Sequence, residues 1–194
     1  MSELVGPVEP ASAARRAEAR LVVRASRGDA DAFTTLVRGY DRPLRALAYR
    51  LLEDEGAMDD ALQDAYVKAY VGLPAFAGAS TFGTWLYRIV YNTCLDELRR
   101  RGRRPVLVSA EPPEEPAAGP DPLAAIEHAA DLSRALGGLG PELRAAVLLV
   151  DAEGLTYDEA AAVLGIPAGT VASRLNRARA LLRPALRGEG GDPR

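Results

Sequence analysis

Six prolines between Pro105 and Pro122 divide this chain of 194 residues into two parts. Proline lacks a backbone N–H and its ring obstructs the preceding helical turn, so such a run excludes a continuous helix or a central strand. Residues 109–131 are also acidic and contain no Lys or Arg. The sequence therefore predicts an extended acidic linker at residues 105–131, with a folded domain on each side.

Both flanking parts have the composition of helices. Ala, Leu and Arg are frequent, and aromatic residues make up only 6% of the chain, which favours helices over sheet. Hydrophobic residues make up 48%, enough for packed cores at this length. We expect an all-α protein with two small helical domains, at residues 13–104 and 132–187, and disordered ends at residues 1–12 and 188–194.

The first candidate binding surface lies at residues 76–104, where a loop of small residues leads into a helix that Ser80 or Thr81 could cap. Arg88 and Asn92 lie one turn apart, and the stretch ends in five arginines. Arginine neutralises phosphates, Asn can hydrogen-bond to the edge of an exposed base, and an aromatic ring can stack on it. The pattern therefore indicates a surface that binds a DNA strand. An amphipathic core helix with a solvated basic end is the alternative. The apolar stripe of this helix consists of Phe82, Trp85, Leu86, Ile89, Val90 and Leu98.

A helix-turn-helix pattern lies in the C-terminal part. Thr156 and Glu159 have the spacing of a capping box, and the short helix that they begin ends at Gly165. After a turn, a second helix begins near Thr170, with apolar residues at helical spacing. Such a unit places its second helix in the major groove of DNA. The polar residues that remain on the outside of this second helix are Thr170, Ser173, Arg174 and Arg177.

Charge is separated into blocks along the chain. The net charge of −3 argues weakly against nucleic-acid binding. Residues 53–64 and 109–131 are acidic, however, while residues 99–104 and 174–187 are strongly basic. Such alternation predicts separate surfaces for separate partners.

Several classes of protein are disfavoured by what the sequence lacks. No stretch approaches the roughly 20 apolar residues of a membrane span, and no signal-peptide core is visible, so we expect a cytoplasmic protein without membrane insertion. The one cysteine, Cys94, fits a reducing compartment and a place in the core. The one histidine, His128, has no cysteine nearby, so we expect no metal and no cofactor. Because no Ser/His/Asp set or glycine-rich phosphate loop is present, we do not expect an enzyme.

The order of residues is more specific than their periodicity. Residues 76–93 read Phe-x-Gly-x-Ser-x-Phe-x-Thr-Trp-Leu-Tyr-Arg-Ile-x-x-Asn-Thr, which resembles the promoter-melting segment of extracytoplasmic-function sigma factors. These are small alternative specificity subunits of bacterial RNA polymerase. Residues 60–70 resemble the helix of the family that binds core polymerase, and residues 153–179 resemble its −35-reading domain.

The resemblance implies an alternative sigma factor, which binds core RNA polymerase, directs it to promoters with −35 and −10 elements, and promotes strand opening. Family members are commonly held inactive by an anti-sigma factor, and nothing in these residues identifies one. By resemblance, the residues expected to bind polymerase are Asp60, Gln63 and Asp64. Those expected at the −10 element are Phe76, Ser80, Arg88 and Asn92. Those expected at the −35 element are Tyr157, Thr170, Ser173, Arg174 and Arg177.

Two positions depart from the family pattern. The residue after Val171 is usually Lys or Arg and is Ala172 here, and Val150 stands where Arg is frequent. Each lost phosphate contact lowers the affinity for DNA and the salt dependence of that affinity. We therefore expect binding to the −35 element to be weaker, or to have a different sequence preference.

Two rival functions stay open. One is a helix-turn-helix regulator that binds duplex DNA alone and does not need the Gln63 helix. The other is a sigma-like protein that occupies polymerase without starting transcription.

Overall fold

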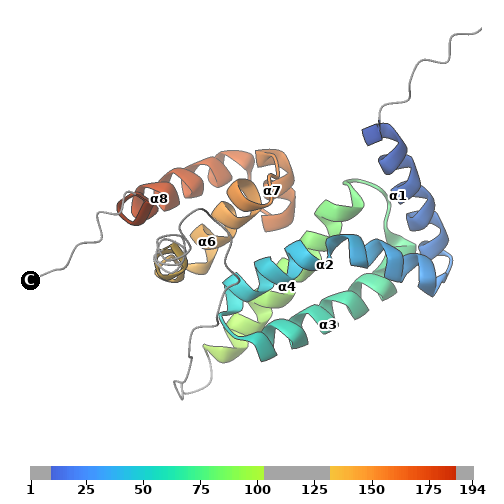
Figure 1. Cartoon of the computed structure of the whole chain (residues 1–194), viewed down its shortest axis with the longest axis horizontal. Coiled ribbons are helices and arrows are strands. Elements are labelled where there is room, and N and C mark those ends of the chain that lie inside the picture. The colour runs from blue at the N-terminus through green and yellow to red at the C-terminus, as the bar shows by residue number, and fades with distance from the viewer. Residues whose placement is uncertain (1–9, 103–131, 187–194) are drawn as a thin grey trace, which may run out of the picture.

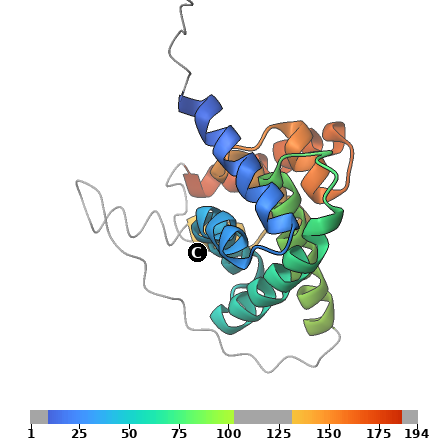
Figure 2. The same ribbon diagram turned by 90° about the vertical axis from the view of Figure 1, so that its right-hand side faces the viewer.

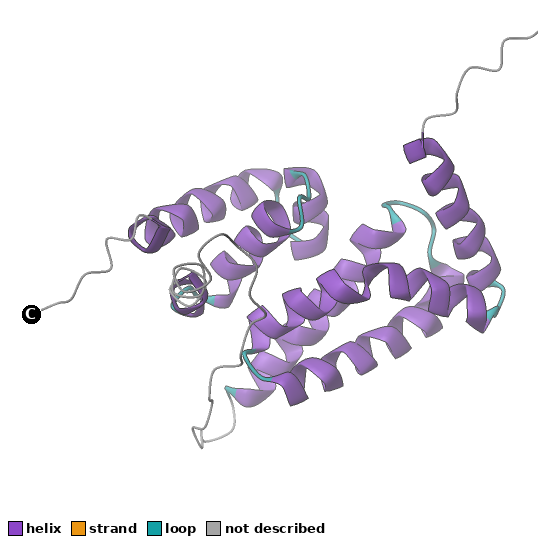
Figure 3. Ribbon diagram, in the orientation of Figure 1, coloured by secondary structure: helices purple, strands orange, loops and turns teal. Residues whose placement is uncertain are grey.

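The computed structural model of the protein describes residues 10–102 and 132–186. Within these ranges every regular element is a helix, which confirms the all-α prediction (Figure 3). The predicted linker at residues 105–131, which contains His128, lies outside the described residues. So do residues 1–9 and the predicted disordered tail at residues 188–194.

The N-terminal part contains α1 (Pro10–Ser26), α2 (Ala30–Leu52), α3 (Glu55–Gly72), the 3-10 turn η1 (Leu73–Ala75) and α4 (Phe82–Arg101). Helices α2, α3 and α4 pack against one another, and α1 crosses one end of this group, where it contacts α2 and η1 (Figure 1). Helix α1 begins at Pro10, so the prediction of disorder at residues 1–12 was wrong for residues 10–12, which are helical.

The C-terminal part contains α6 (Pro141–Val147), the π-helical turn η2 (Leu148–Ala152), α7 (Tyr157–Leu164) and α8 (Ala168–Leu186). Residues 132–137 are also helical. Helices α6 and α7 pack against α8. In addition, α7 contacts α4 and α6 contacts α2, so the two parts lie directly against each other (Figure 2).

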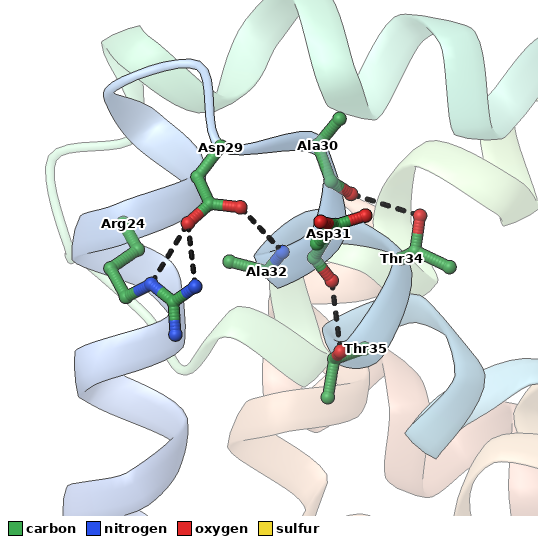
Figure 4. A network of polar contacts seen from close by, with 7 residues as sticks. All are labelled: Arg24, Asp29, Ala30, Asp31, Ala32, Thr34 and Thr35. Atoms are coloured by element: carbon green, nitrogen blue, oxygen red, sulfur yellow. Dashed lines mark hydrogen bonds and ion pairs between the residues drawn. The ribbon is translucent and has the colours of Figure 1, made fainter.

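Side-chain caps decide where the helices begin. Asp29 caps α2, because its Oδ1 accepts a hydrogen bond from the N–H of Ala32 at 2.9 Å while its other oxygen accepts from Arg24 (Figure 4). The bond from Ala32, followed by that from Arg24, holds the pKa of Asp29 below its usual range. Thr81 caps α4 by accepting a hydrogen bond from the N–H of Thr84 at 3.1 Å. Of the two candidate caps in the sequence, Thr81 is therefore the one used.

Pro43 lies inside α2 without interrupting it, although proline in a helix interior usually kinks or breaks the helix. Helix α2 is continuous from Ala30 to Leu52. The proline costs roughly 3 kcal/mol in a helix interior. Three leucines that follow it, Leu44, Leu47 and Leu51, are almost completely buried. Because burying each such side chain contributes about 1.5–3 kcal/mol, packing outweighs the local cost.

Helix α4 is the central helix of the molecule. It contacts α2 and α3 as well as α7. The predicted apolar stripe covers only part of its surface, whereas Tyr87 and Tyr91 are also buried, at 6% and 3% exposure. Buried residues of α6, η2, α7 and α8 belong to the same continuous core as those of α2, α3 and α4. A smaller cluster fills the space between residues 132–139, α6 and α8.

Gly83 generates a prediction, because the side chain of Tyr40 from α2 packs directly against this position of α4. A Cβ atom at this position would lie 2.8 Å from the ring of Tyr40, whose hydroxyl donates to Glu18 at 3.0 Å. We predict that Gly83→Ala lowers the free energy of unfolding by about 1–3 kcal/mol through overpacking. The matched control is Gly39→Ala, where nothing lies within 4 Å. It should raise that free energy by about 0.5–1 kcal/mol.

Urea denaturation followed by circular dichroism measures both variants. Changes of the same sign and size at the two positions would show that the contact between α4 and Tyr40 does not limit packing.

Candidate nucleic-acid interface

Arg88 and Asn92 are the two positions between Phe82 and Leu95 where α4 is exposed to solvent. The other residues of this stretch are buried or half-buried against neighbouring helices. The structure thus leaves one exposed strip on α4, with a guanidinium and an amide one helical turn apart. Both groups can donate hydrogen bonds to a phosphate or to a base edge.

The loop before α4 is anchored by aromatic rings. The ring centroid of Phe76 lies 5.1 Å from that of Trp85 and 6.4 Å from that of Phe82. Gly78 has φ = +71°, a backbone conformation that a side chain would strain. Phe76 and Ser80 are both half-buried, so each keeps part of its surface accessible beside the α4 strip.

Asp60, Gln63 and Asp64 are all exposed on α3. Gln63 lines a hollow between α2 and α3. Beside it, Val67 is 59% exposed and Val71 is 73% exposed. Exposed apolar side chains next to polar groups are typical of a protein-binding surface. The sequence analysis did not single out these two valines.

The helix-turn-helix prediction is confirmed by α7, the turn after it, and α8. Thr156 Oγ1 accepts a hydrogen bond from the N–H of Glu159 at 3.2 Å, and Glu159 Oε2 accepts one from the N–H of Thr156 at 2.9 Å. The bond from the N–H of Thr156, followed by one from its hydroxyl to the same carboxylate oxygen, holds the pKa of Glu159 below its usual range. Gly165 ends α7 in the left-handed conformation, with φ = +67°.

The four polar residues predicted on the second helix all lie in the first half of α8. Ser173 and Arg177 are exposed, whereas Thr170 and Arg174 are half-buried. Arg174 forms an ion pair with Glu142 of α6, and 21% of its side chain is exposed. Burial raises the pKa of Tyr91 on α4, and the nearby guanidinium of Arg174 partly offsets that rise. Arg174 is therefore close to both α6 and α4.

Tyr157, at the start of α7, is 41% exposed. Beside it lies Arg179, whose Nε and Nη2 donate to the two oxygens of Asp151 at 3.0 and 2.5 Å. This bidentate pair connects η2 to α8. The sequence analysis did not identify the pair, because neither residue carries a local signal for a partner so distant in the chain.

The described arginines at the end of α4 are paired with carboxylates. The pairs are Arg99–Asp96, Arg100–Glu97, Arg101–Glu97 and Arg101–Asp54. Exposed ion pairs of this kind contribute little to stability, so a phosphate can compete for the same guanidinium groups. Arg103 and Arg104, the remaining members of the basic run, lie outside the described residues.

The described residues contain no cluster of three or more His, Cys, Asp or Glu that could hold a metal ion. Cys94 is fully buried, and burial raises the pKa of its thiol to about 12, so the thiol stays protonated at neutral pH. None of the helices over residues 10–102 and 132–186 is both long and apolar enough to cross a membrane.

Comparisons with known proteins agree with this geometry. Residues 36–104 match the family model for sigma-70 region 2, and residues 129–182 match that for sigma-70 region 4. The chain is 38% identical to the RNA polymerase sigma-H factor of Pseudomonas aeruginosa over 184 residues, which covers 86% of this chain and 92% of the relative. It is 40% identical to the extracytoplasmic-function sigma factor SigM of Mycobacterium tuberculosis over 167 residues, which covers 86% of this chain and 83% of the relative.

Solved structures give the same result. The sigma factor RpoE of Bartonella quintana, in complex with the anti-sigma factor NepR, superposes with a TM-score of 0.63 at 32% identity and covers 74% of this chain and 89% of its own. CnrH, in complex with the cytosolic domain of CnrY, superposes with a TM-score of 0.68 at 30% identity and covers 90% of this chain and 99% of its own. The chain therefore belongs to the extracytoplasmic-function sigma factors, the alternative subunits that bind core RNA polymerase and direct it to promoters.

Proposed function

We propose that the two parts of this sigma factor divide the work of initiation. Residues 13–104 bind polymerase and open the −10 element, and residues 132–187 recognise the −35 element. The observation that carries this proposal is the exposed strip of Arg88 and Asn92 on the part of α4, from Phe82 to Leu95, that is otherwise covered. The polymerase face on α3 and the polar residues of α8 lie on different helices, which supports separate roles for the three surfaces.

At the −10 element, Asn92 and Arg88 contact the non-template strand while Phe76 stacks on a base that has left the duplex. Ser80 lies in the same loop and donates to its phosphate or base. Capturing an unstacked base offsets an unstacking cost of a few kcal/mol and traps the open state without ATP. In this division of labour the polymerase performs the chemistry, and this chain, acting in the cytoplasm, is not an enzyme.

Core polymerase is bound through the polar rim of Asp60, Gln63 and Asp64 and the apolar surface of Val67 and Val71. The support is their common exposure on α3. Buried apolar contacts supply most of the affinity of such an interface, and the polar rim supplies its specificity.

At the −35 element, the first half of α8 enters the major groove and Tyr157 lies near the DNA backbone. Ser173 and Arg177 are already exposed for this role, whereas Arg174 must exchange the carboxylate of Glu142 for a base or a phosphate.

Because solved relatives include a sigma factor bound to an anti-sigma factor, we also expect this chain to have a protein inhibitor of that class.

Asn92→Ala tests the assignment of the −10 strip. We predict that it impairs promoter opening at least tenfold, because one base contact made only in the open state is lost, while the affinity for core polymerase stays unchanged. The reciprocal variant, Gln63→Ala, should weaken polymerase binding. Both are measured by transcription in vitro with sigma-free core polymerase on a genomic fragment library, together with a direct binding assay for core.

Discrete transcripts that share −35 and −10 elements and need Asn92 are the expected result. Loss of core binding in Asn92→Ala would refute the division of labour. Core binding by the natural chain without any specific starts would instead favour a sigma-like protein that occupies polymerase. The evidence for such a protein is the absence of positive charge at Ala172 and Val150, where the family usually has a basic residue.

Ala172→Arg tests the missing charge on α8. We predict tighter binding to a promoter duplex and a salt dependence steeper by about 0.9 in log–log slope, because one more phosphate is neutralised. Ala180→Arg is the matched control, since it adds the same charge to an exposed position further along α8. Fluorescence anisotropy at several salt concentrations measures both. Equal gains at the two positions would mean that net charge, and not the place of residue 172, limits the affinity.

A further inference from the structure

Helix α1 and the turn after it carry a concentration of positive charge that the proposed function does not use. Residues 10–28 contain five arginines and one acidic residue, Glu18. Glu18 is half-buried against α2, where its carboxylate accepts a hydrogen bond from the hydroxyl of Tyr40 at 3.0 Å. Arg24 is engaged by Asp29, the cap of α2 (Figure 4). The other arginines of this segment are all exposed, and they are Arg15, Arg16, Arg20 and Arg27.

Two of these arginines, Arg16 and Arg20, define a basic face of α1. They lie four positions apart, so their side chains leave the same side of the helix about 6 Å from each other along its axis. Neither forms an ion pair with any residue in the ranges 10–102 and 132–186. Arg174 and Arg179 of α8, in contrast, are engaged by carboxylates of the chain itself. The basic face of α1 can therefore bind an anion without first giving up a partner.

The charges on this helix also repel one another. Like charges four positions apart destabilise a helix, and Arg16, Arg20 and Arg24 form two such pairs in succession. A bound polyanion removes this repulsion, because its own charges neutralise both members of a pair. Among residues 13–26, the one large apolar side chain that is exposed is Val23, at 49%. Because protein-binding surfaces have an apolar centre, the basic face suits a nucleic-acid backbone better than a protein.

Helix α1 lies next to the loop that is proposed to capture a base. It contacts η1, from which the chain passes directly to Phe76. The loop between η1 and α4 lies beside α1 in both views (Figure 1, Figure 2). Phe76 in turn packs against Trp85 of α4, the helix with the exposed strip. A DNA strand that is bound at this strip and continues beyond the loop therefore passes close to α1.

We propose that the basic face of α1 binds the sugar–phosphate backbone of the single strand on one side of the −10 element, as a contact that does not read sequence. Arg16 and Arg20 donate hydrogen bonds to phosphate oxygens. Their separation of about 6 Å corresponds to about two nucleotides at 3.4 Å each, so each arginine can bind a phosphate of its own. This inference rests on the proposed function for the position of the strand, but the phosphate contact itself can be tested without a promoter.

The test variant is Arg16→Gln/Arg20→Gln, which removes both charges and keeps residues of similar helix propensity. Arg38→Gln/Arg42→Gln is the matched control. Arg38 and Arg42 are also one turn apart, are exposed on α2, and form no ion pair within the described ranges. A third variant, Arg16→Lys/Arg20→Lys, keeps the charge and should retain binding, because Lys also binds phosphate, as a point charge. Thermal melting by circular dichroism checks that every variant is folded.

The first measurement uses the full chain and a labelled oligothymidine strand of about 20 nucleotides, which carries phosphates but no promoter sequence. Fluorescence anisotropy gives the affinity at several salt concentrations. For Arg16→Gln/Arg20→Gln, the slope of log affinity against log salt should be shallower by about 1.4, because each phosphate contact on a single strand contributes about 0.7. Its affinity at about 0.1 M salt should fall roughly 10–25-fold. The control on α2 and the Lys variant should keep the natural slope.

The second measurement uses the complex of the chain with core polymerase and the non-template strand of the −10 element that the transcription experiment recovers. The strand either ends at the element or extends about five nucleotides beyond it on one side or the other. One of the two extensions should raise the affinity of the natural chain and have no such effect in Arg16→Gln/Arg20→Gln. Asn92→Ala should weaken the binding of all three strands.

The outcomes separate this inference from the proposed function. Equal slopes in Arg16→Gln/Arg20→Gln and the α2 control, or no binding of oligothymidine by the natural chain even at low salt, would overturn the contact with phosphate. Unchanged DNA binding with weaker binding of core polymerase would assign the basic face to a protein and overturn it too. A loss in Arg16→Gln/Arg20→Gln without any effect of Asn92→Ala would support the basic face and count against the proposed −10 strip instead.

Discussion

The burial of α4 on more than one side is the constraint on which the rest of the structure depends. An isolated amphipathic helix has one apolar stripe, but α4 also buries Tyr87 and Tyr91, because α7 covers a face that α2 and α3 leave open. What remains exposed between Phe82 and Leu95 is a narrow strip. Packing on all other sides fixes the position of the backbone that carries Arg88 and Asn92, which supports the role proposed for this strip.

The buried guanidinium of Arg144 gives the contact between the two parts a different character from apolar packing. Its Nη1 donates to the carbonyl of Arg50 and to Glu53, both in the N-terminal part. The Glu53 side chain is 56% exposed, so water screens part of this ion pair. The carbonyls of Gly137 and Leu139 accept from Nη2, and Nε has no hydrogen-bond partner among the described residues. Most partners of this buried charge are therefore backbone carbonyls, which bind it only while the end of α2 and the segment before α6 keep their places.

Local structure could be predicted from the sequence, and contacts between distant segments could not. The capping box of Thr156 and Glu159 and the turn at Gly165 depend on neighbours within a few residues, so their spacing was sufficient. Pro43 shows the limit of such local rules, because the packing that offsets its cost within α2 comes from distant segments. Glu53 and Arg144 lie 91 positions apart; Glu53 appeared only as part of an acidic block, and Arg144 was not singled out. No periodicity encodes which member of an acidic block meets a buried arginine.

Electrostatics bears on how a chain with a net charge of −3 can bind promoter DNA. Arginines of α4 and α8 near the predicted DNA surfaces are engaged by carboxylates of the chain itself, as in Arg174 with Glu142 and Arg99 with Asp96. A phosphate must displace the carboxylate from each of these arginines. Each phosphate contact therefore contributes less binding free energy than a contact with an unpaired guanidinium would. Polymerase binding raises the local concentration of promoter DNA at these surfaces and makes many weak exchanges cooperative. Weak intrinsic affinity is therefore compatible with specific initiation, because specificity depends on the difference between promoter and other DNA and not on total attraction.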